Sequence, residues 1–171
     1  MNAPVSATLA RLRQTFESGK TRPIEWRLQQ LSEIDRMLRD HESDFAEALK
    51  ADLGKCRFEA DLTETSFVQA EAKYARKHLE DWMRPQRVRT PLMAQPGKSY
   101  IQPEPKGVVL IIAPWNYPMS MVMAPLVGAV AAGNCAIMKP SEITSHTSAA
   151  LARILPRYLD NEAFAVVEGG I

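Results

Sequence analysis

Cysteine is scarce in this sequence. Cys56 and Cys135 are the only two among 171 residues, and they lie in different segments without the spacing of a metal site. So few cysteines argue against a disulfide framework and favour a reducing, cytoplasmic setting. Both are expected to be structural, because Cys135 belongs to a short apolar run that is predicted to be a buried strand and Cys56 has no histidine or acid at a spacing that indicates a nucleophile.

Glycine-rich phosphate-binding motifs are missing as well. The eight glycines form neither G-x-G-x-x-G nor G-x-x-x-x-G-K-S/T, which excludes the usual glycine cradles for phosphate. Two polar segments remain as places for binding chemistry. They are the turn at 114–118 and residues 139–142, and each follows an apolar run.

An excess of charge of one sign is absent. Lys plus Arg number 21 against 20 Asp plus Glu, so there is no electrostatic case for a nucleic-acid or anionic-membrane partner. The N-terminus lacks the continuous apolar stretch of a secretory signal. The uncharged run 107–138 is long enough to cross a membrane, but three prolines and the Gly133-Asn134 pair interrupt it, so a buried strand followed by a buried helix is preferred.

The first half of the chain is charge-rich and has helical periodicity. Apolar spacing predicts helices over 24–38, over 42–52 with an end near Gly54, and over about 58–83. We therefore assign 1–84 to a helical N-terminal segment without catalytic groups.

Side-chain positions in these helices follow from the same periodicity. The last helix is expected to place six apolar residues largely along one side: Phe58, Leu62, Ala72, Ala75, Leu79 and Trp82. The many charged residues are expected to form a solvated face, and His41 and His78 to face solvent.

Prolines and a glycine gather after residue 84, which is typical of a connector and indicates a domain boundary at 85–105. A phosphate or nucleic-acid patch at Arg84, Arg87 and Arg89 is the less favoured alternative, because the cluster is short. Residues 99–102 are predicted to be extended, and the prolines after them keep them out of a central strand.

The segment 106–171 alternates between apolar runs and helical patterns. Strands are predicted at 107–113, 135–138 and 164–167, with helices over 120–132 and about 144–158 between them. The first strand is expected to be buried on both faces. This α/β pattern predicts the first β-α-β-α-β half of a doubly wound, Rossmann-like parallel sheet. Three strands leave exposed edges and an uncovered face, so we expect the chain to be incomplete at its C-terminus.

Polar groups at two strand ends could carry chemistry. Carboxyl ends of parallel strands meet at one edge of the sheet, so these groups are expected to be neighbours. The amide of Asn116 could donate to a developing oxyanion; an Asx turn is the alternative that spacing alone favours. Lys139 and Glu142 could bind a ribose, with a surface ion pair at a helix entry as the alternative.

Several short motifs together resemble the aldehyde dehydrogenase superfamily. They are PKGVV at 105–109, PWNYP at 114–118, Pro125-Leu126, AAGN at 131–134 and KPSE at 139–142. Each motif is weak alone, but the set is specific. The helical segment, with ALKADLGK at 48–55 and Trp82 near its end, is similar to the class 3 branch, which includes fatty and aromatic aldehyde dehydrogenases and has the coniferyl aldehyde dehydrogenases close to it.

The resemblance implies NAD- or NADP-dependent oxidation of an aldehyde to a carboxylic acid. In that family a cysteine thiolate attacks the aldehyde, hydride passes to the nicotinamide, and a glutamate-activated water releases the acid. The nucleophile and the general base belong to parts of the family chain beyond Ile171, and neither cysteine here sits in the nucleophile motif. The resemblance therefore implies an N-terminal fragment that is inactive alone, from a full-length homodimer.

The resemblance also implies site residues. Asn116 matches the asparagine of the oxyanion hole, Lys139 the lysine at the adenosine ribose, and Glu142 its acidic partner. The cofactor-binding positions it implies are Ile112, Ala113, Pro114, Trp115, Asn116, Lys139, Ser141 and Glu142. The choice between NAD and NADP stays open, because Glu142 disfavours a 2′-phosphate and Lys139 sits beside it.

Two other functions remain open at this point. The chain could be a natural truncation that acts as a non-catalytic nucleotide-binding or assembly module through its open sheet edge. It could also belong to a CoA-acylating or reductive relative within the same superfamily.

Overall fold

The computed structural model describes residues 5–170. Its α-helices are α1 (Val5–Glu17), α2 (Ile24–Asp40), α3 (Glu42–Leu53), α4 (Arg57–Ala60), α5 (Ser66–Met83), α6 (Ser120–Ala131) and α7 (Ser145–Ile154). Its strands are β1 (Gln86–Val88), β2 (Ser99–Ile101), β3 (Val108–Ile112), β4 (Cys135–Lys139) and β5 (Phe164–Val166). A π-helical turn, η1 (Asp61–Thr65), joins α4 to α5, and 3₁₀ turns η2 (Leu92–Ala94) and η3 (Leu155–Arg157) complete the set.

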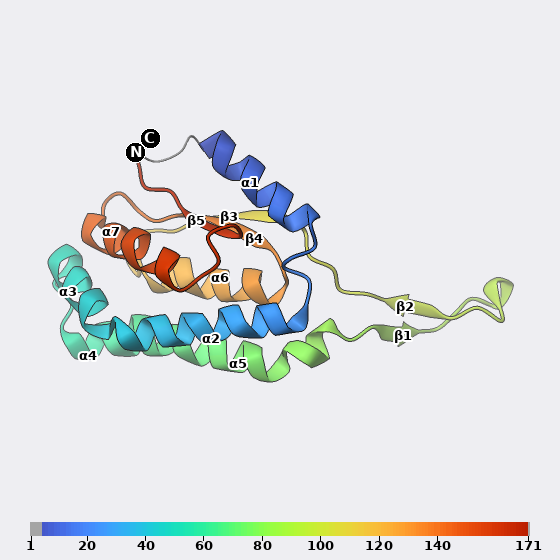
Figure 1. The fold of residues 1–171 in the computed structure, drawn as a ribbon. Coiled ribbons are helices and arrows are strands. Elements are labelled where there is room, and N and C mark those ends of the chain that lie inside the picture. The colour runs from blue at the N-terminus through green and yellow to red at the C-terminus, as the bar shows by residue number, and fades with distance from the viewer. Residues whose placement is uncertain (1–4, 171) are drawn as a thin grey trace.

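The strands β3, β4 and β5 form a parallel sheet in that order, with α6 and α7 as the crossovers. This confirms the predicted β-α-β-α-β unit. Figure 1 shows α1 on one face of the sheet and α6 on the other, with α2 and α5 packed beneath α6. The apolar stripes of the helices and the sheet thus share one core.

The predicted burial of the first strand on both faces is wrong. The side chains of Leu110 and Ile112 in β3 are 62% and 68% exposed, whereas the first four residues of β4 are buried. The reason is position: β4 has a neighbour on each side, while β3 is an edge strand. An apolar run reports that a strand can be buried but not which elements are present to cover it.

The helix predicted over 58–83 is interrupted by η1, and its apolar residues do not all face inward. Ala72, Ala75 and Leu79 are buried, but Phe58 is 74%, Leu62 58% and Trp82 46% exposed. The π-helical turn accounts for part of this, since its extra residue shifts the helix face before and after it.

Asn134 ties the end of α6 to the start of β3. Gly133 takes the left-handed conformation at φ 80°, as glycine does after a helix. The buried Asn134 Oδ1 then accepts hydrogen bonds from the N–H groups of Lys106 (2.7 Å) and Gly107 (2.9 Å). The Gly-Asn pair of the sequence therefore sets the entry of two parallel strands.

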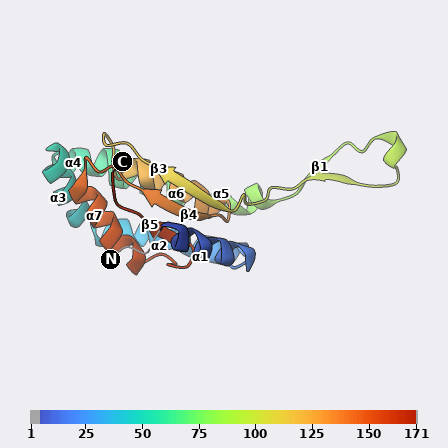
Figure 2. The same cartoon turned by 90° about the horizontal axis from the view of Figure 1, so that it is seen from above.

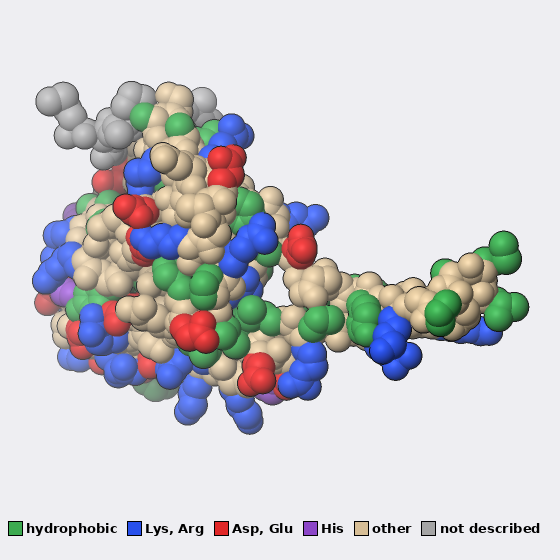
Figure 3. Space-filling model, turned by 45° about the vertical axis from the view of Figure 1, so that its right-hand side comes forward, with side chains coloured by type: hydrophobic (Ala, Val, Ile, Leu, Met, Phe, Trp, Pro, Cys, Tyr) green, Lys and Arg blue, Asp and Glu red, His purple; other side chains and the backbone are tan. Residues whose placement is uncertain are grey.

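The connector assigned to 85–105 contains an antiparallel hairpin, β1–β2. β2 confirms the extended segment predicted at 99–102, whereas β1 and the pairing of the two strands were not predicted. The hairpin projects as an arm from the body of the protein in both ribbon views (Figures 1 and 2). The space-filling view shows apolar side chains on this arm (Figure 3), and Leu92 and Met93 near its tip are 87% and 99% exposed. No helix within 5–170 is long and apolar enough to cross a membrane.

Candidate active site

The register of the sheet brings the two polar strand ends together. Ile112, the last residue of β3, lies opposite Lys139, the last residue of β4. The Ala113 N–H donates to the Lys139 carbonyl at 3.1 Å, one step beyond the strand. The turn at 114–118 and residues 139–142 are therefore neighbours at the carboxyl edge of the sheet, where ligands bind in open α/β folds.

Asn116 lies on the surface of the turn. Within residues 5–170 its side-chain amide makes no hydrogen bond, so the Asx-turn alternative does not describe this conformation. Its backbone carbonyl instead accepts a hydrogen bond from Lys55 Nζ at 3.3 Å. The turn is thus anchored through the main chain of Asn116, and the amide stays available to a ligand.

Lys55 and Glu64 form a buried ion pair beneath this turn. Glu64 is 0% and Lys55 7% exposed, and their Nζ and Oε1 atoms are 2.6 Å apart. The expectation that the charged residues of the N-terminal helices form a solvated face is wrong for these two and for Arg27, which is 6% exposed. A buried charge needs compensating partners. Lys55 and Glu64 compensate each other, and Lys55 and Arg27 also donate hydrogen bonds to backbone carbonyls in the segment after residue 106.

The second oxygen of Glu64 caps α6. Oε2 accepts hydrogen bonds from the N–H groups of Met119 (3.2 Å) and Ser120 (2.7 Å). The helix has Met119 at its N-cap and no side-chain cap of its own, so its free N–H groups need an acceptor from elsewhere. Glu64 was not predicted from the sequence; a methionine at the helix start, which cannot cap it, is the one feature from which an acceptor elsewhere could have been inferred. The N-terminus of α6 is consequently filled from within and does not offer a phosphate site.

Lys139 and Glu142 form an ion pair at the other strand end. The hydrogen bond from Lys139 lowers the pKa of the exposed Glu142 carboxyl below its usual range. The chain after β5 returns to this place, since a Cβ on Gly170 would lie 3.6 Å from Glu142 Cγ. Ser141 is buried, and its hydroxyl accepts a hydrogen bond from the Ile143 N–H at 3.3 Å, so its visible role is to shape the turn.

The remaining strand-end positions differ in what they can offer a ligand. Ile112 is 68% and Trp115 52% exposed, and Pro114 is exposed too, so a flat molecule could lie along them. Ala113 is buried, and only its main chain reaches the edge.

The two cysteines have opposite surroundings. Cys135 is completely buried in β4, and this burial raises the pKa of its thiol to about 11, which suppresses the reactive thiolate. Cys56 is exposed and precedes α4. Within residues 5–170 no cluster of three or more His, Cys, Asp or Glu side chains could hold a metal ion.

The two histidines of the helical segment are less exposed than expected. The His41 side chain is 13% exposed, lies 2.7 Å from Asp44 and meets the edge of the Tyr158 ring. His78 is half-buried between Tyr74 and Trp82. Both positions serve packing on the helix surface.

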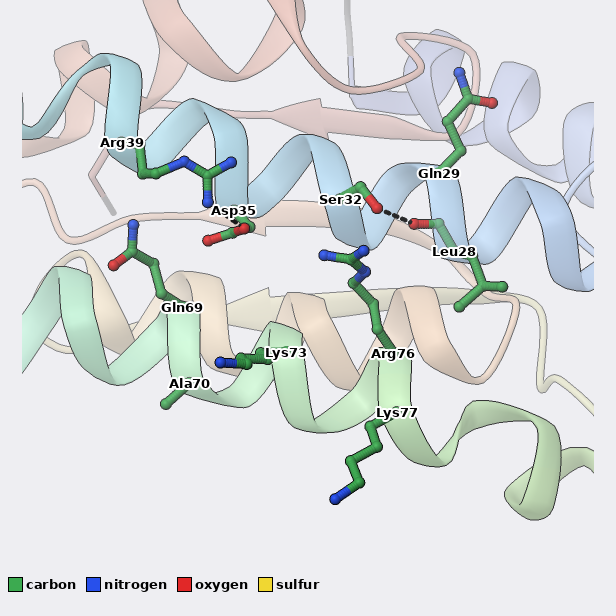
Figure 4. A pocket seen from close by; sticks show the side chains of 10 residues that line it. All are labelled: Leu28, Gln29, Ser32, Asp35, Arg39, Gln69, Ala70, Lys73, Arg76 and Lys77. Carbon is green, nitrogen blue, oxygen red and sulfur yellow. Dashed lines mark hydrogen bonds and ion pairs between the residues drawn. The ribbon is translucent and has the colours of Figure 1, made fainter.

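A wide groove of about 960 Å³ lies between α2 and α5, away from the strand ends (Figure 4). Four basic side chains line it: Arg39, Lys73, Arg76 and Lys77. Arg39 is paired with Asp35 in α2. The groove contains no residue of the two strand ends, so the strand-end edge remains the better candidate for chemistry.

Comparison with known proteins places this geometry in a family. Residues 2–171 match the aldehyde dehydrogenase family. Aldehyde dehydrogenase family 3 member B1 of Bos taurus is 48% identical over 167 residues, which make up 98% of this chain and 36% of that protein. The dimeric, NADP-preferring aldehyde dehydrogenase of Canis lupus familiaris is 44% identical over 167 residues, 98% of this chain and 37% of that protein.

Solved structures give the same answer for the fold. The substrate-bound state of Staphylococcus aureus AldH superposes with a TM-score of 0.95 at 42% identity, over 99% of this chain and 37% of that one. The chain thus spans about a third of the length of the proteins it matches.

Proposed function

This chain belongs to the aldehyde dehydrogenase family, and on that premise we propose that it is the N-terminal part of an NAD- or NADP-dependent enzyme that oxidises an aldehyde to a carboxylic acid. The observation that supports this most directly is Asn116. Its carbonyl is bound by Lys55 while its amide is free at the carboxyl edge of the sheet. With its main chain anchored and its amide unpaired within residues 5–170, Asn116 can present an N–H donor to a developing oxyanion at this edge.

The cofactor in this proposal lies along the same edge. Lys139 and Glu142 would bind the adenosine ribose, and the exposed strand end from Ile112 to Trp115 would flank the cofactor. Ser141 would act through the turn that carries Glu142 rather than by direct contact. When bound, NAD or NADP supplies the hydride acceptor.

The nucleophile and the general base lie outside these 171 residues in this proposal. Cys135 is buried with a raised pKa, and Cys56, which is exposed before α4, does not sit in the family's nucleophile motif. We therefore expect the isolated chain to turn over no aldehyde. Aldehyde-dependent formation of NADH or NADPH by the purified 171-residue chain would contradict this expectation.

We propose that the full-length protein is a cytoplasmic homodimer. The similar canine enzyme is named as dimeric, and the β1–β2 arm presents apolar side chains that one copy could place on another, including Val88, Leu92, Met93, Tyr100 and Ile101. Light scattering on the full-length protein would test the dimer. Replacing Leu92 and Met93 by aspartate should then lower the measured mass towards that of a monomer.

The test of the catalytic proposal is Asn116→Ala in the full-length enzyme. Loss of one oxyanion donor should lower kcat by about 10²–10³-fold and leave the KM for the cofactor nearly unchanged. A matched control is Asn161→Ala, which removes another asparagine from an exposed turn remote from the strand ends. An unchanged kcat in Asn116→Ala would reject the role of Asn116.

A further inference from the structure

We propose that the Lys55–Glu64 ion pair is a positioning unit that sets the place of the Asn116 amide at the sheet edge. This inference rests on the proposed function, in which Asn116 is an oxyanion donor. The pair lies in the N-terminal helical segment and outside the strand ends, and neither Lys55 nor Glu64 was assigned a role in the site from the sequence.

The pair holds the turn at two places. Lys55 Nζ donates to the Asn116 carbonyl at 3.3 Å, and Glu64 Oε2 accepts from the N–H groups of Met119 and Ser120 at 3.2 and 2.7 Å. Lys55 Nζ also lies 4.1 Å from the centre of the Tyr117 ring, at cation–π distance. The residues on both sides of the turn are therefore fixed relative to one ion pair.

The pair itself is rigidly placed. Lys55 follows Gly54, which ends α3 in the left-handed conformation at φ 69°. Glu64 lies in the π-helical turn η1, and such turns are frequent at functional sites. Asp61 Oδ1 accepts hydrogen bonds from the hydroxyls of Thr65 (2.9 Å) and Ser66 (2.8 Å), which fastens the turn from its outer side.

The stability of the fold alone does not require a buried ion pair at this position. Neutral, well-packed residues in place of a buried ion pair are often no less stable, and α6 could be capped by a local serine or aspartate. What the pair adds is direction: the Asn116 carbonyl is bound on the inner side of the turn, so its amide is left on the outer side. A displacement of a catalytic donor by about 1 Å can cost 10²-fold in rate.

The test is a double-mutant cycle on kcat in the full-length enzyme. Lys55→Met, Glu64→Gln and the combined neutral variant Lys55→Met/Glu64→Gln are each made with Asn116 and with Asn116→Ala. We expect each to lower kcat by about 10–10²-fold when Asn116 is present and by less than about twofold when it is alanine. The KM for the cofactor should stay within about twofold of wild type.

The combined variant keeps the test decisive where a single substitution fails to fold, because it leaves no unpaired buried charge. Lys55→Arg, which keeps the cation, should recover part of the lost kcat relative to Lys55→Met. Asp52→Asn is the matched control, since Asp52 caps α7 as Glu64 caps α6; its effect on kcat should be the same with and without Asn116.

The outcomes separate the two proposals. If Asn116→Ala alone leaves kcat unchanged, the proposed oxyanion role fails. If Asn116→Ala lowers kcat but the effects of the pair and of Asn116 multiply independently, the oxyanion role stands and the positioning role is overturned. A pair variant that lowers only the melting temperature, with kcat unchanged, overturns it as well.

Discussion

The guanidinium of Arg27 occupies the space where a side chain on Gly133 would have to go. A Cβ built on Gly133 would lie 2.5 Å from Arg27 Nη2 and 2.6 Å from its Cζ. The guanidinium cannot easily retreat, because Nε donates to the Thr21 carbonyl and Nη1 to the Ala131 carbonyl, both at 3.1 Å. The contact joins α2 to the end of α6, immediately before β4.

Gly133→Ala should therefore destabilise the protein by about 2–5 kcal/mol. Alanine at φ 80° costs about 1–2 kcal/mol, and displacing the buried guanidinium from its hydrogen bonds adds about 1–3 kcal/mol. Denaturant unfolding of the variant would measure the sum. The control is Gly54→Ala, at φ 69° with no atom within 4 Å of an added Cβ, which should show only the backbone part. Equal losses in the two variants would contradict a role for Arg27.

The sequence predicted those elements whose signal is local. The apolar runs of 106–171 and the Gly133-Asn134 pair gave the strands and crossovers of the sheet correctly. The extended segment at 99–102 was predicted, but its pairing with β1 was missed, because both strands are only three residues long and show no alternation of apolar and polar residues. A hairpin whose strands are this exposed has no buried face to impose a periodic pattern on the sequence.

The sequence predicted only part of the candidate site, for a different reason. Asn116, Lys139 and Glu142 stand next to strand ends, so topology alone placed them together. Glu64 lies 55 positions from Met119 in the sequence. In a charge-rich helix, the sequence does not distinguish a buried glutamate that caps another helix from a glutamate that is exposed to solvent. Its burial follows from tertiary contacts that the sequence pattern does not encode.

The N-terminal helices complete both crossovers of the sheet. Glu64 caps α6, and Asp52 caps α7 with hydrogen bonds from the N–H groups of His146 (3.1 Å) and Thr147 (2.7 Å). The charged helical segment without catalytic groups is thus what fixes the two helices that follow the strand ends.

The cap on α7 predicts a pH dependence of stability. Burial alone would raise the pKa of Asp52, but the hydrogen bonds from Thr147 and His146 outweigh it, and the net pKa is below its ordinary value of about 3.9. A carboxyl with a depressed folded-state pKa stabilises the fold above its unfolded pKa. Its contribution should be complete above about pH 5 and disappear as the pH falls through the folded-state pKa.

Asp52→Asn should remove this contribution. We expect a loss of about 1–2 kcal/mol at pH 7, from the cap and its charge. The loss should become smaller below about pH 4, where Asp52 of the unfolded wild-type chain begins to bind a proton, and should shrink further as the pH falls through the lower folded-state pKa. Thermal unfolding between pH 3 and 7 would show the two curves converging on the acid side. Parallel curves would mean that the ionisation of Asp52 does not contribute.

The burial of Cys135 predicts a protected thiol. Its side chain is inaccessible and its pKa is raised to about 11, so both access and ionisation oppose alkylation at pH 7.5. Iodoacetamide followed by peptide mass spectrometry should label Cys135 only after the protein is unfolded in denaturant. Labelling of Cys135 in the native protein, at a rate near that of a free thiol, would contradict the buried position of β4.

The charge of Glu142 should decide how the proposed enzyme discriminates between NAD and NADP. Lys139 holds the pKa of the Glu142 carboxyl below its usual range, so it is ionised at pH 7. A carboxylate at the adenosine ribose accepts a hydrogen bond from a 2′-hydroxyl and repels a 2′-phosphate. Glu142→Gln in the full-length enzyme should therefore raise the ratio of kcat/KM for NADP to that for NAD by about tenfold.

A substitution of Lys139 distinguishes the role of this lysine from that of Glu142. Lys139→Met removes the paired cation, which attracts the phosphates of both cofactors, and should raise the KM of both. The ratio should then move towards NAD, since the Glu142 charge is no longer offset. A ratio that is unchanged in Glu142→Gln, while Lys139→Met weakens both cofactors, would place Lys139 at the ribose and leave Glu142 as the partner that orients it.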